Sequence, residues 1–225
     1  PCGWMLDSYR FLCEVSLKIP GAQRITGKPA HIRIFWYYLG LGVFLLAIYA
    51  CARRNEKHKD CRETADLCVS RRKKRLQGIV FSCFIAFLLL FLLFPQKKSF
   101  EIDFLDVGQG DGIYLCTGGG TSMFIDGGST DVKQVGKYRI LPFLKAKGVS
   151  EISYWFVSHT DTDHVSGLKE VLVSGYRVEY LVFAKAVEKE AKTKELAELA
   201  RSHGTKVLYM QAGDTVRSKR AAMRC

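Results

Sequence analysis

One short segment carries four side chains that can bind metal ions. Residues 158–164 read SHTDTDH, which places His159, Asp161, Asp163 and His164 within a few positions of one another. Imidazole nitrogens and carboxylate oxygens are ligands that Zn²⁺ and Mn²⁺ accept, and carboxylates shift the preference toward harder ions. On a turning loop, positions 159 and 161 can converge on one ion while 163 and 164 reach a second. Two such ions can hold a bridging hydroxide and clamp a phosphoryl or acyl group.

The surroundings of this segment favour a site. It follows the apolar run 152–157, ISYWFV, and precedes a helical pattern, and sites of α/β proteins form at the carboxyl ends of strands. The alternative is a solvated acidic turn whose histidines cap the following helix. The pattern HxDxDH seldom arises by chance in a chain with 5 histidines. We therefore expect a centre for two divalent metal ions, Zn²⁺ or Mn²⁺.

From residue 100 onward the hydrophobic pattern of the sequence is typical of an α/β domain. It predicts strands over 100–104, 113–116, 122–126, 152–157, 178–183 and 207–210, and helices over 138–147, 165–173 and 186–202. Phe100, Ile102 and Phe104 alternate with acidic residues, which predicts a half-buried first strand. A hairpin followed by strand–helix alternation favours a mixed sheet with packed helices.

Two apolar runs precede this domain. Residues 34–52 and 76–94 are each about 19 residues long, enough for a helix to cross a membrane. Buried core helices are the weaker alternative, because a soluble helix of this length keeps a polar face. The connecting loop 53–75 is strongly basic, so the positive-inside rule places it in the cytoplasm. Residues 1–33 then form an extracytoplasmic or interfacial segment, and the α/β domain also lies outside the cytoplasm.

The net charge of +12 does not by itself indicate nucleic-acid binding. About half of the excess positive charge sits in the loop 53–75, where membrane topology already explains it. The eight cysteines show neither the spacing of a zinc knuckle nor that of a disulfide framework. We expect them to be ordinary thiols.

A series of motifs resembles the metallo-β-lactamase superfamily: FLDVGQGDG (104–112), FIDGG (124–128), RILPFLKAKGV (139–149) and VSHTDTDHVSGL (157–168). More narrowly, the chain resembles the C-terminal part of the bacterial competence DNA-internalisation channel (ComEC) family. Asp161 stands where the usual superfamily motif, HxHxDH, has its second His, and this replacement is typical of the competence-channel branch. The two apolar runs also resemble the end of that family's membrane-embedded region.

The resemblance implies a partial metallo-β-lactamase-like domain. The N-terminal half of that domain would occupy 97–225, after a segment of two transmembrane helices over 34–96. The family's later elements, an Asp in a Gly-Asp turn and further histidines, are expected to be absent. Gly213-Asp214 comes too early in the order, and His203 is expected to cap a helix end. A centre without those ligands should bind metal weakly, so the chain alone is expected to be a poor hydrolase.

The same resemblance implies roles for individual residues. His159 and Asp161 would bind the first ion, and Asp163 and His164 the second. Asp163 would also act as the general base that deprotonates the attacking water.

Two further carboxylates are implicated less directly. Asp126, at the end of a predicted strand, would support the metal-binding loop by hydrogen bonding, and Asp111 in the GQGD turn would lie at the rim of the site. The alternative for both is ordinary turn chemistry, because Asp before Gly is common in turns.

The function implied by the resemblance is DNA uptake by a multi-pass protein of the bacterial plasma membrane. Its partners would be DNA, the lipid bilayer and other proteins of the competence machinery, and its extracytoplasmic domain would be a metal-dependent phosphodiesterase. The residues themselves leave two alternatives open. One is a membrane-anchored metallohydrolase of another ester or phosphodiester without transport, and the other is a non-catalytic domain that gates or scaffolds a pore.

Overall fold

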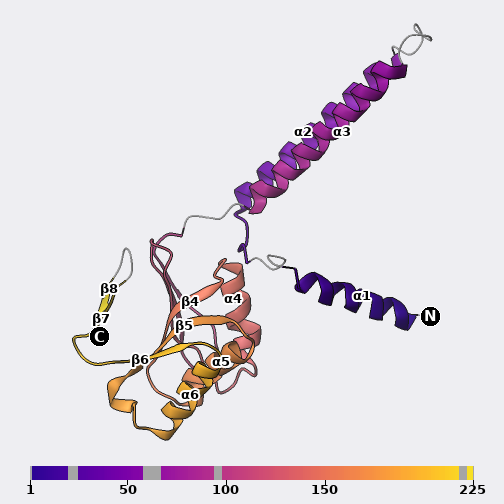
Figure 1. Ribbon diagram of the computed structural model, residues 1–225. Coiled ribbons are helices and arrows are strands. Elements are labelled where there is room, and N and C mark those ends of the chain that lie inside the picture. Colours follow the sequence, from indigo (N-terminus) through magenta and orange to yellow (C-terminus); the bar gives the residue numbers. More distant parts are fainter. Residues whose placement is uncertain (1, 20–24, 58–66, 94–97, 218–221, 225) are drawn as a thin grey trace. The chain divides into compact units, whose positions relative to one another are not determined.

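The computed structural model describes residues 2–19, 25–57, 67–93, 98–217 and 222–224 (Figure 1). The chain divides into two compact units, one of Lys28–Pro95 and one of Pro1–Gly27 with Gln96–Cys225. Residues 58–66, in the middle of the predicted basic loop, lie outside the described residues.

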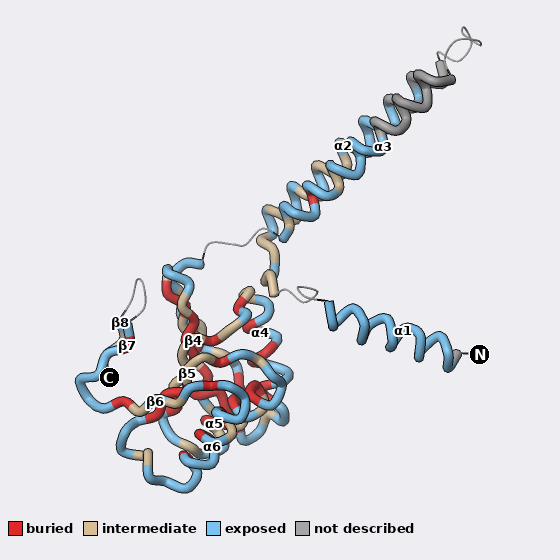
Figure 2. The backbone as a smooth tube through the Cα atoms, viewed as in Figure 1, coloured by how far each residue is buried: buried red, intermediate tan, exposed pale blue. Residues whose placement is uncertain are grey.

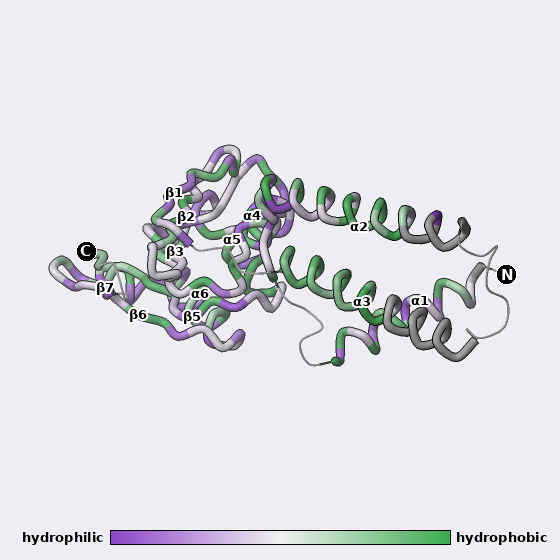
Figure 3. Tube along the Cα trace, turned by 90° about the horizontal axis from the view of Figure 1, so that it is seen from above, coloured by the Kyte–Doolittle hydropathy of each residue, from purple (hydrophilic) through white to green (hydrophobic). Residues whose placement is uncertain are grey.

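Two long helices, α2 (His31–Lys57) and α3 (Leu67–Leu93), pair within the unit Lys28–Pro95. Phe44 of α2 stacks on Phe84 of α3 with ring centroids 4.3 Å apart. Figure 3 shows apolar residues along α2 and along the coloured part of α3. By length and composition His31–Ala50 can cross a membrane, whereas the described apolar part of α3, Gly78–Leu93, is shorter. Of the two predicted spans, the described residues thus support one as a full-length candidate.

Helix α1 (Cys2–Leu17) carries most of its apolar side chains exposed. Trp4, Phe11 and Leu12 are among them, while Arg10 and Glu14 form an ion pair one helical turn apart.

The α/β domain is built on a six-stranded mixed sheet whose strands lie in chain order. They are β1 (Glu101–Phe104), β2 (Gly112–Cys116), β3 (Ser122–Asp126), β4 (Glu151–Val157), β5 (Arg177–Ala184) and β6 (Lys206–Met210). The first three pair antiparallel, and β3 to β6 run parallel. A short hairpin of β7 (Thr215–Arg217) and β8 (Ala222–Arg224) follows. The predicted mixed sheet is confirmed, and this hairpin was not predicted.

Three helices cover one face of the sheet (Figure 1): α4 (Leu141–Ala146), α5 (Thr162–Val173) and α6 (Ala191–Ser202). A π-helical turn, η2 (Gly136–Ile140), leads into α4, and a 3₁₀ turn, η3 (Lys185–Val187), precedes α6. Their inward side chains pack on Phe124 and Trp155, whose rings stack 4.4 Å apart. Figure 2 shows the buried residues concentrated between these helices and the sheet. This layer is the hydrophobic core of the domain.

The opposite face of the sheet is apolar in two rows of paired residues. One row joins Ile102, Leu115, Met123, Tyr154 and Tyr180, and the other joins Phe104, Ile113, Ile125, Phe156, Val182 and Leu208. Residues paired across strands share a face, so each row crosses the whole sheet or nearly so. We call these two rows the outer face.

The burial predicted for β1 is wrong, although the strand itself is confirmed. Phe104 is 78% exposed, whereas Glu101 and Asp103 are half-buried and form ion pairs with Lys147 after α4. Burial lowers the pKa of Lys147, but the hydrogen bonds to these carboxylates outweigh it and leave that pKa above its ordinary value. These ion pairs stabilise the edge strand with its acidic side turned toward the helices.

Helix α5 meets the end of β3 at very short range because glycines stand at the contact. A Cβ on Gly167 of α5 would lie 2.1 Å from the carbonyl oxygen of Gly127. A Cβ on Gly128 would lie 2.4 Å from the backbone nitrogen of His164. Neither distance is compatible with a side chain. The glycines therefore bring the first turn of α5 against the strand end.

We predict that Gly167→Ala lowers the free energy of unfolding by about 3 kcal/mol, because the new methyl group forces backbone apart in a packed core. Urea-induced unfolding of the chain in detergent measures this change. Gly118→Ala is the control, since its Cβ would come no closer than 3.9 Å to a neighbouring atom. Equal urea midpoints for the two variants would contradict the close packing of α5.

Candidate metal centre

The SHTDTDH segment lies between the carboxyl end of β4 and the first turn of α5. Asp161 is the N-cap residue of α5. Asp163 and His164 lie within the first turn of this helix, whereas the sequence predicted a loop at these positions. The side chain of Asp161 makes no capping hydrogen bond, and the turn is closed by the amide of His164, which donates to the carbonyl of Asp161 at 3.0 Å. The segment's acidic side chain at the N-cap is thus directed away from the helix end.

Potential ligand atoms converge in two groups that share His164. One group consists of His159, Asp163 and His164, and the other of Asp111, Asp126 and His164, each with its atoms within 4.8 Å of one another. Nε2 of His164 lies 3.5 Å from Oδ2 of Asp163, and Nδ1 lies 3.1 Å from Oδ2 of Asp126. The two imidazole rings have centroids 3.5 Å apart. His164 therefore stands between the two groups.

Asp126 is a buried carboxylate that joins β3 to the SHTDTDH segment. It accepts hydrogen bonds from the backbone N–H and the hydroxyl of Ser158, both at 2.8 Å. Its own backbone is left-handed, with φ at 57°, and its carbonyl accepts a hydrogen bond from Trp155. A buried charge needs such partners. Nδ1 of His164 lies against Asp126 and Nε2 lies on the side of Asp163, an arrangement that leaves Nε2 as the nitrogen that could bind a metal ion.

Asp111 lies at the exposed edge of the second group. Its Oδ2 is 3.8 Å from Nδ1 of His164, and its side chain is 65% exposed. Its backbone carbonyl accepts hydrogen bonds from Gly127 and Gly128, at 2.7 and 3.3 Å. The GQGD turn is thus tied to the end of β3.

A second carboxylate holds this turn from the other side. Asp131 accepts hydrogen bonds from the backbone N–H of Gln109 and from the hydroxyl of Ser129, both at 2.8 Å. These hydrogen bonds lower the pKa of Asp131 below its ordinary value, the one from Gln109 having the largest effect.

Asp161 lies outside both groups. Its Oδ1 accepts a hydrogen bond from the Lys192 ammonium of α6 at 3.0 Å. That hydrogen bond and the lysine's charge lower the pKa of Asp161 and raise the pKa of Lys192. The predicted pairing of Asp161 with His159 on one ion stays a prediction, because it requires Asp161 to exchange this lysine for the metal.

Two residues near the site were missed by sequence reasoning. The hydroxyl of Ser158 lies within 3.0 Å of Nδ1 of His159 and also donates to Asp126, so it bridges the two. Its position directly before His159 was the signal that could have identified it. Lys192 had no such signal, since it is 31 residues from Asp161 and only the packing of α6 brings it there.

Other acidic and histidine residues serve local structure. His203 is the C-cap residue of α6, with Nδ1 2.9 Å from the carbonyl oxygen of Leu199, as predicted. Asp214 accepts a hydrogen bond from the amide of Gln211 in the turn before β7. Neither belongs to a ligand group among the described residues.

The fold and the site together define an α/β domain with acidic and histidine side chains that can hold a metal ion at the carboxyl end of its parallel strands. No protein-family model matches the chain. The chain is 27% identical over 169 residues to "ComE operon protein 3" of Bacillus subtilis, covering 68% of this chain and 22% of that protein. It is 31% identical over 106 residues to "Recombination protein 2" of Haemophilus influenzae, covering 46% of this chain and 13% of that protein. Both similarities support the ComEC family resemblance, and the chain spans less than a quarter of either relative.

We predict that Asp126→Asn lowers the free energy of unfolding by about 2 kcal/mol, because it removes a charged acceptor and leaves buried donors unpaired. Urea-induced unfolding measures the change. The exposed Asp214→Asn is the control and should shift the midpoint far less. If Asp126→Asn unfolds at the same urea concentration as the unmodified chain, the carboxylate does not organise the site.

We also predict that Lys192→Ala raises the pKa of Asp161 back toward its ordinary value. A lowered folded-state pKa contributes stability above the unfolded pKa, and this contribution is lost as the pH falls through the folded pKa. Because Asp161 is exposed, the titration is the readout, followed by carbon NMR of the carboxylate. Lys194→Ala, on the same helix, should leave the pKa of Asp161 unchanged, and identical titrations in both variants would contradict the ion pair.

Proposed function

We propose that this chain is part of a membrane protein that takes up DNA across the bacterial plasma membrane. Its α/β domain, in this proposal, binds divalent metal ions and supports hydrolysis of phosphodiester bonds outside the cytoplasm. The observation that carries the proposal is the convergence of His159, Asp163 and His164 at the end of the sheet. Similarity to ComE operon protein 3 supports the link to competence.

The donor set fits a divalent cation. Two imidazoles and three carboxylates supply nitrogen and oxygen ligands, which suit Zn²⁺ and Mn²⁺. His159 and Asp161 would hold one ion once Asp161, which lies outside both ligand groups, exchanges Lys192 for the metal, and Asp163 and His164 would hold the other. When bound, such ions supply an activated water and stabilise the charge that develops in phosphoryl transfer.

The protein's own residues have distinct tasks in this proposal. Asp163, which faces Nε2 of His164, takes the proton from the attacking water as general base. Asp126 orients His164 through Nδ1, and Ser158 connects Asp126 to His159. The fold of the domain, in the same proposal, is that of the N-terminal half of a metallo-β-lactamase-like domain.

The proposed topology has two spans. α2 crosses the membrane over His31–Ala50, α3 returns, and the basic loop between them lies in the cytoplasm. This places the α/β domain on the extracytoplasmic side, where incoming DNA would reach it. Since the chain covers 22% and 13% of its two relatives, transport is proposed for a full-length protein and metal binding for this chain.

Metal affinity of the chain tests the centre directly. Calorimetric titration with Mn²⁺ and Zn²⁺ should show binding that Asp163→Ala and His164→Ala each weaken about tenfold or more, because each variant removes a ligand. Asp214→Ala and His203→Ala are matched controls outside the ligand groups and should change the affinity less than twofold, a small effect for residues that touch no ion. Equal affinities for all five proteins would contradict the assignment.

Cleavage separates the proposal from its alternatives. A full-length protein should cut single-stranded DNA only with added metal, and Asp163→Asn should abolish cleavage while DNA binding persists. Metal-dependent hydrolysis of other esters without uptake of DNA would instead indicate a membrane-anchored hydrolase. Intact DNA uptake by the Asp163→Ala variant would indicate a gating or scaffolding domain.

A further inference from the structure

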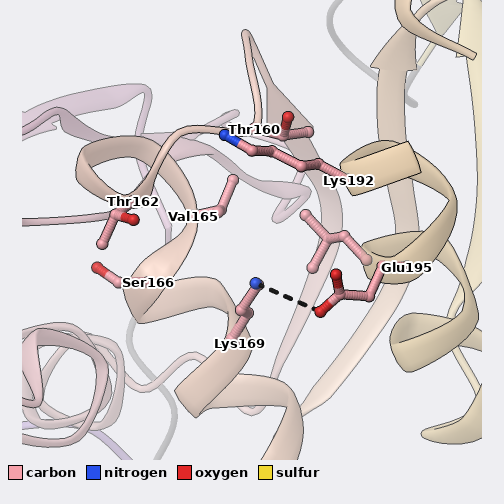
Figure 4. A pocket seen from close by; sticks show the side chains of 8 residues that line it. Thr160, Thr162, Val165, Ser166, Lys169, Lys192 and Glu195 are labelled. Carbon is pink, nitrogen blue, oxygen red and sulfur yellow. Dashed lines mark ion pairs between the residues drawn. The ribbon is translucent and has the colours of Figure 1, made fainter. Parts of the chain in front are cut away.

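A cleft of about 230 Å³ lies between α5 and α6 beside the metal-binding segment (Figure 4). Its floor is apolar, with Val165 and Leu196 both buried. Its rim carries hydroxyl and ammonium groups, from Thr160, Thr162, Ser166, Lys169 and Lys192. Figure 4 shows Lys192 reaching along one side of the cleft toward Thr160, with Lys169 at the other end. We call this hollow the lysine cleft.

The lysine cleft and the candidate metal centre share a wall. Thr160 and Thr162 line the cleft, and they flank Asp161 in the segment that supplies the metal ligands. The hydroxyls of these two threonines make no hydrogen bond to a described residue, whereas Ser166 is engaged with Ser129. The hydroxyls of Thr160 and Thr162, which lie between the cleft and the metal centre, could therefore donate hydrogen bonds to a ligand.

The residues that line the lysine cleft carry a net positive charge, and each of the two lysines has a carboxylate as its neighbour. Its lining holds two lysines against one glutamate, Glu195. Lys169 lies 4.0 Å from Glu195, a loose contact, and Lys192 pairs with Asp161 at 3.0 Å. The side chains of Lys169 and Lys192 are 45% and 69% exposed. Exposed ion pairs stabilise weakly, so an entering anion can recruit both ammonium groups.

We propose that the lysine cleft binds a backbone phosphate of the nucleic-acid strand, next to the phosphate presented to the metal centre. The inference rests on the proposed function, because it takes the strand to lie across the shared wall. Ammonium and hydroxyl groups suit the oxygens of a phosphodiester, and contacts of this kind carry no sequence information. The strand is thereby held in register by its backbone alone.

The test is binding of a fluorescein-labelled single-stranded oligonucleotide to the 225-residue chain in detergent, in EDTA, by anisotropy over a salt series. Lys169→Ala and Lys192→Ala should each weaken binding about fivefold and reduce the slope of log K against log salt by about 0.7. Lys192→Arg should retain binding. Lys194→Ala is the matched control, because Lys194 is exposed on α6 and does not line the cleft. Binding by the basic loop is common to all variants, so this comparison isolates the cleft.

A gain of affinity gives a second, independent readout. Glu195→Gln removes the cleft's only lining carboxylate and should tighten binding about threefold, since one repulsive charge is lost. Glu198→Gln, also exposed on α6 but outside the cleft, should have no such effect. A variant that folds poorly cannot bind more tightly, so this result separates electrostatics from stability.

Several outcomes would overturn the inference. They are equal effects of Lys169→Ala, Lys192→Ala and Lys194→Ala, and no oligonucleotide binding by the unmodified chain. Displacement of the oligonucleotide by millimolar inorganic phosphate or by polyglutamate, dependent on Lys192, would assign the cleft to free phosphate or an acidic peptide. Because binding is measured in EDTA, loss of the cleft is distinguishable from failure of the metal centre, which the metal titration reports.

Discussion

The buried carboxylate of Asp126 is the constraint on which the geometry of the site depends. A carboxylate with so little contact with solvent needs polar partners. The backbone N–H and the hydroxyl of Ser158 donate to it, and Nδ1 of His164 lies 3.1 Å from it. These partners come from the end of β4 and the first turn of α5, so one carboxylate draws three elements together. The left-handed backbone of Asp126 is tolerated because Trp155 and the following glycines hold it. The strained residue and the candidate ligands therefore belong to one cooperative arrangement.

Much of the α/β domain could be predicted from the sequence because its strands and helices have clear hydrophobic periodicity. All six strands of the main sheet were anticipated, and so was the position of the SHTDTDH segment directly after β4. Both depend on local patterns of residues near one another in the chain. The short hairpin β7–β8 has three residues in each strand, too few for such a pattern to be seen.

The remainder depended on contacts between residues far apart in sequence. The orientation of β1 is set by Lys147, more than forty positions away, against the local apolar pattern. The position of Asp161 is likewise set by Lys192 of α6. Helix α5 begins earlier than its apolar pattern suggests, because its first turn is closed by backbone hydrogen bonds that leave no side-chain signature. Periodicity identifies elements, whereas long-range ion pairs decide which of their faces is turned inward.

Charge is divided sharply around the amino end of α5. The ligand groups gather three carboxylates, while the lysine cleft on the other side of Thr160 and Thr162 gathers two ammonium groups. A negatively charged strand is repelled by the first in the absence of cations and attracted by the second. Metal ions that neutralise the carboxylates would make the charge of the ligand groups positive as well. The ligand groups and the lysine cleft would then form one continuous positively charged surface. If the centre binds metal ions as proposed, its occupancy would favour the approach of an anionic polymer.

The outer face of the sheet has a consequence for how the chain behaves at high concentration. Its two apolar rows cross the sheet, and Phe104 and Ile102 at the edge are well exposed. Net charge opposes association between chains over long distances, but at physiological salt it is screened within about 8 Å, whereas apolar contact acts once surfaces touch. Contact through the exposed part of this face therefore favours association between chains at high concentration, despite the net charge of +12. The detergent needed to keep α2 in solution would also cover the outer face. The solubility of the chain should therefore depend on the detergent concentration.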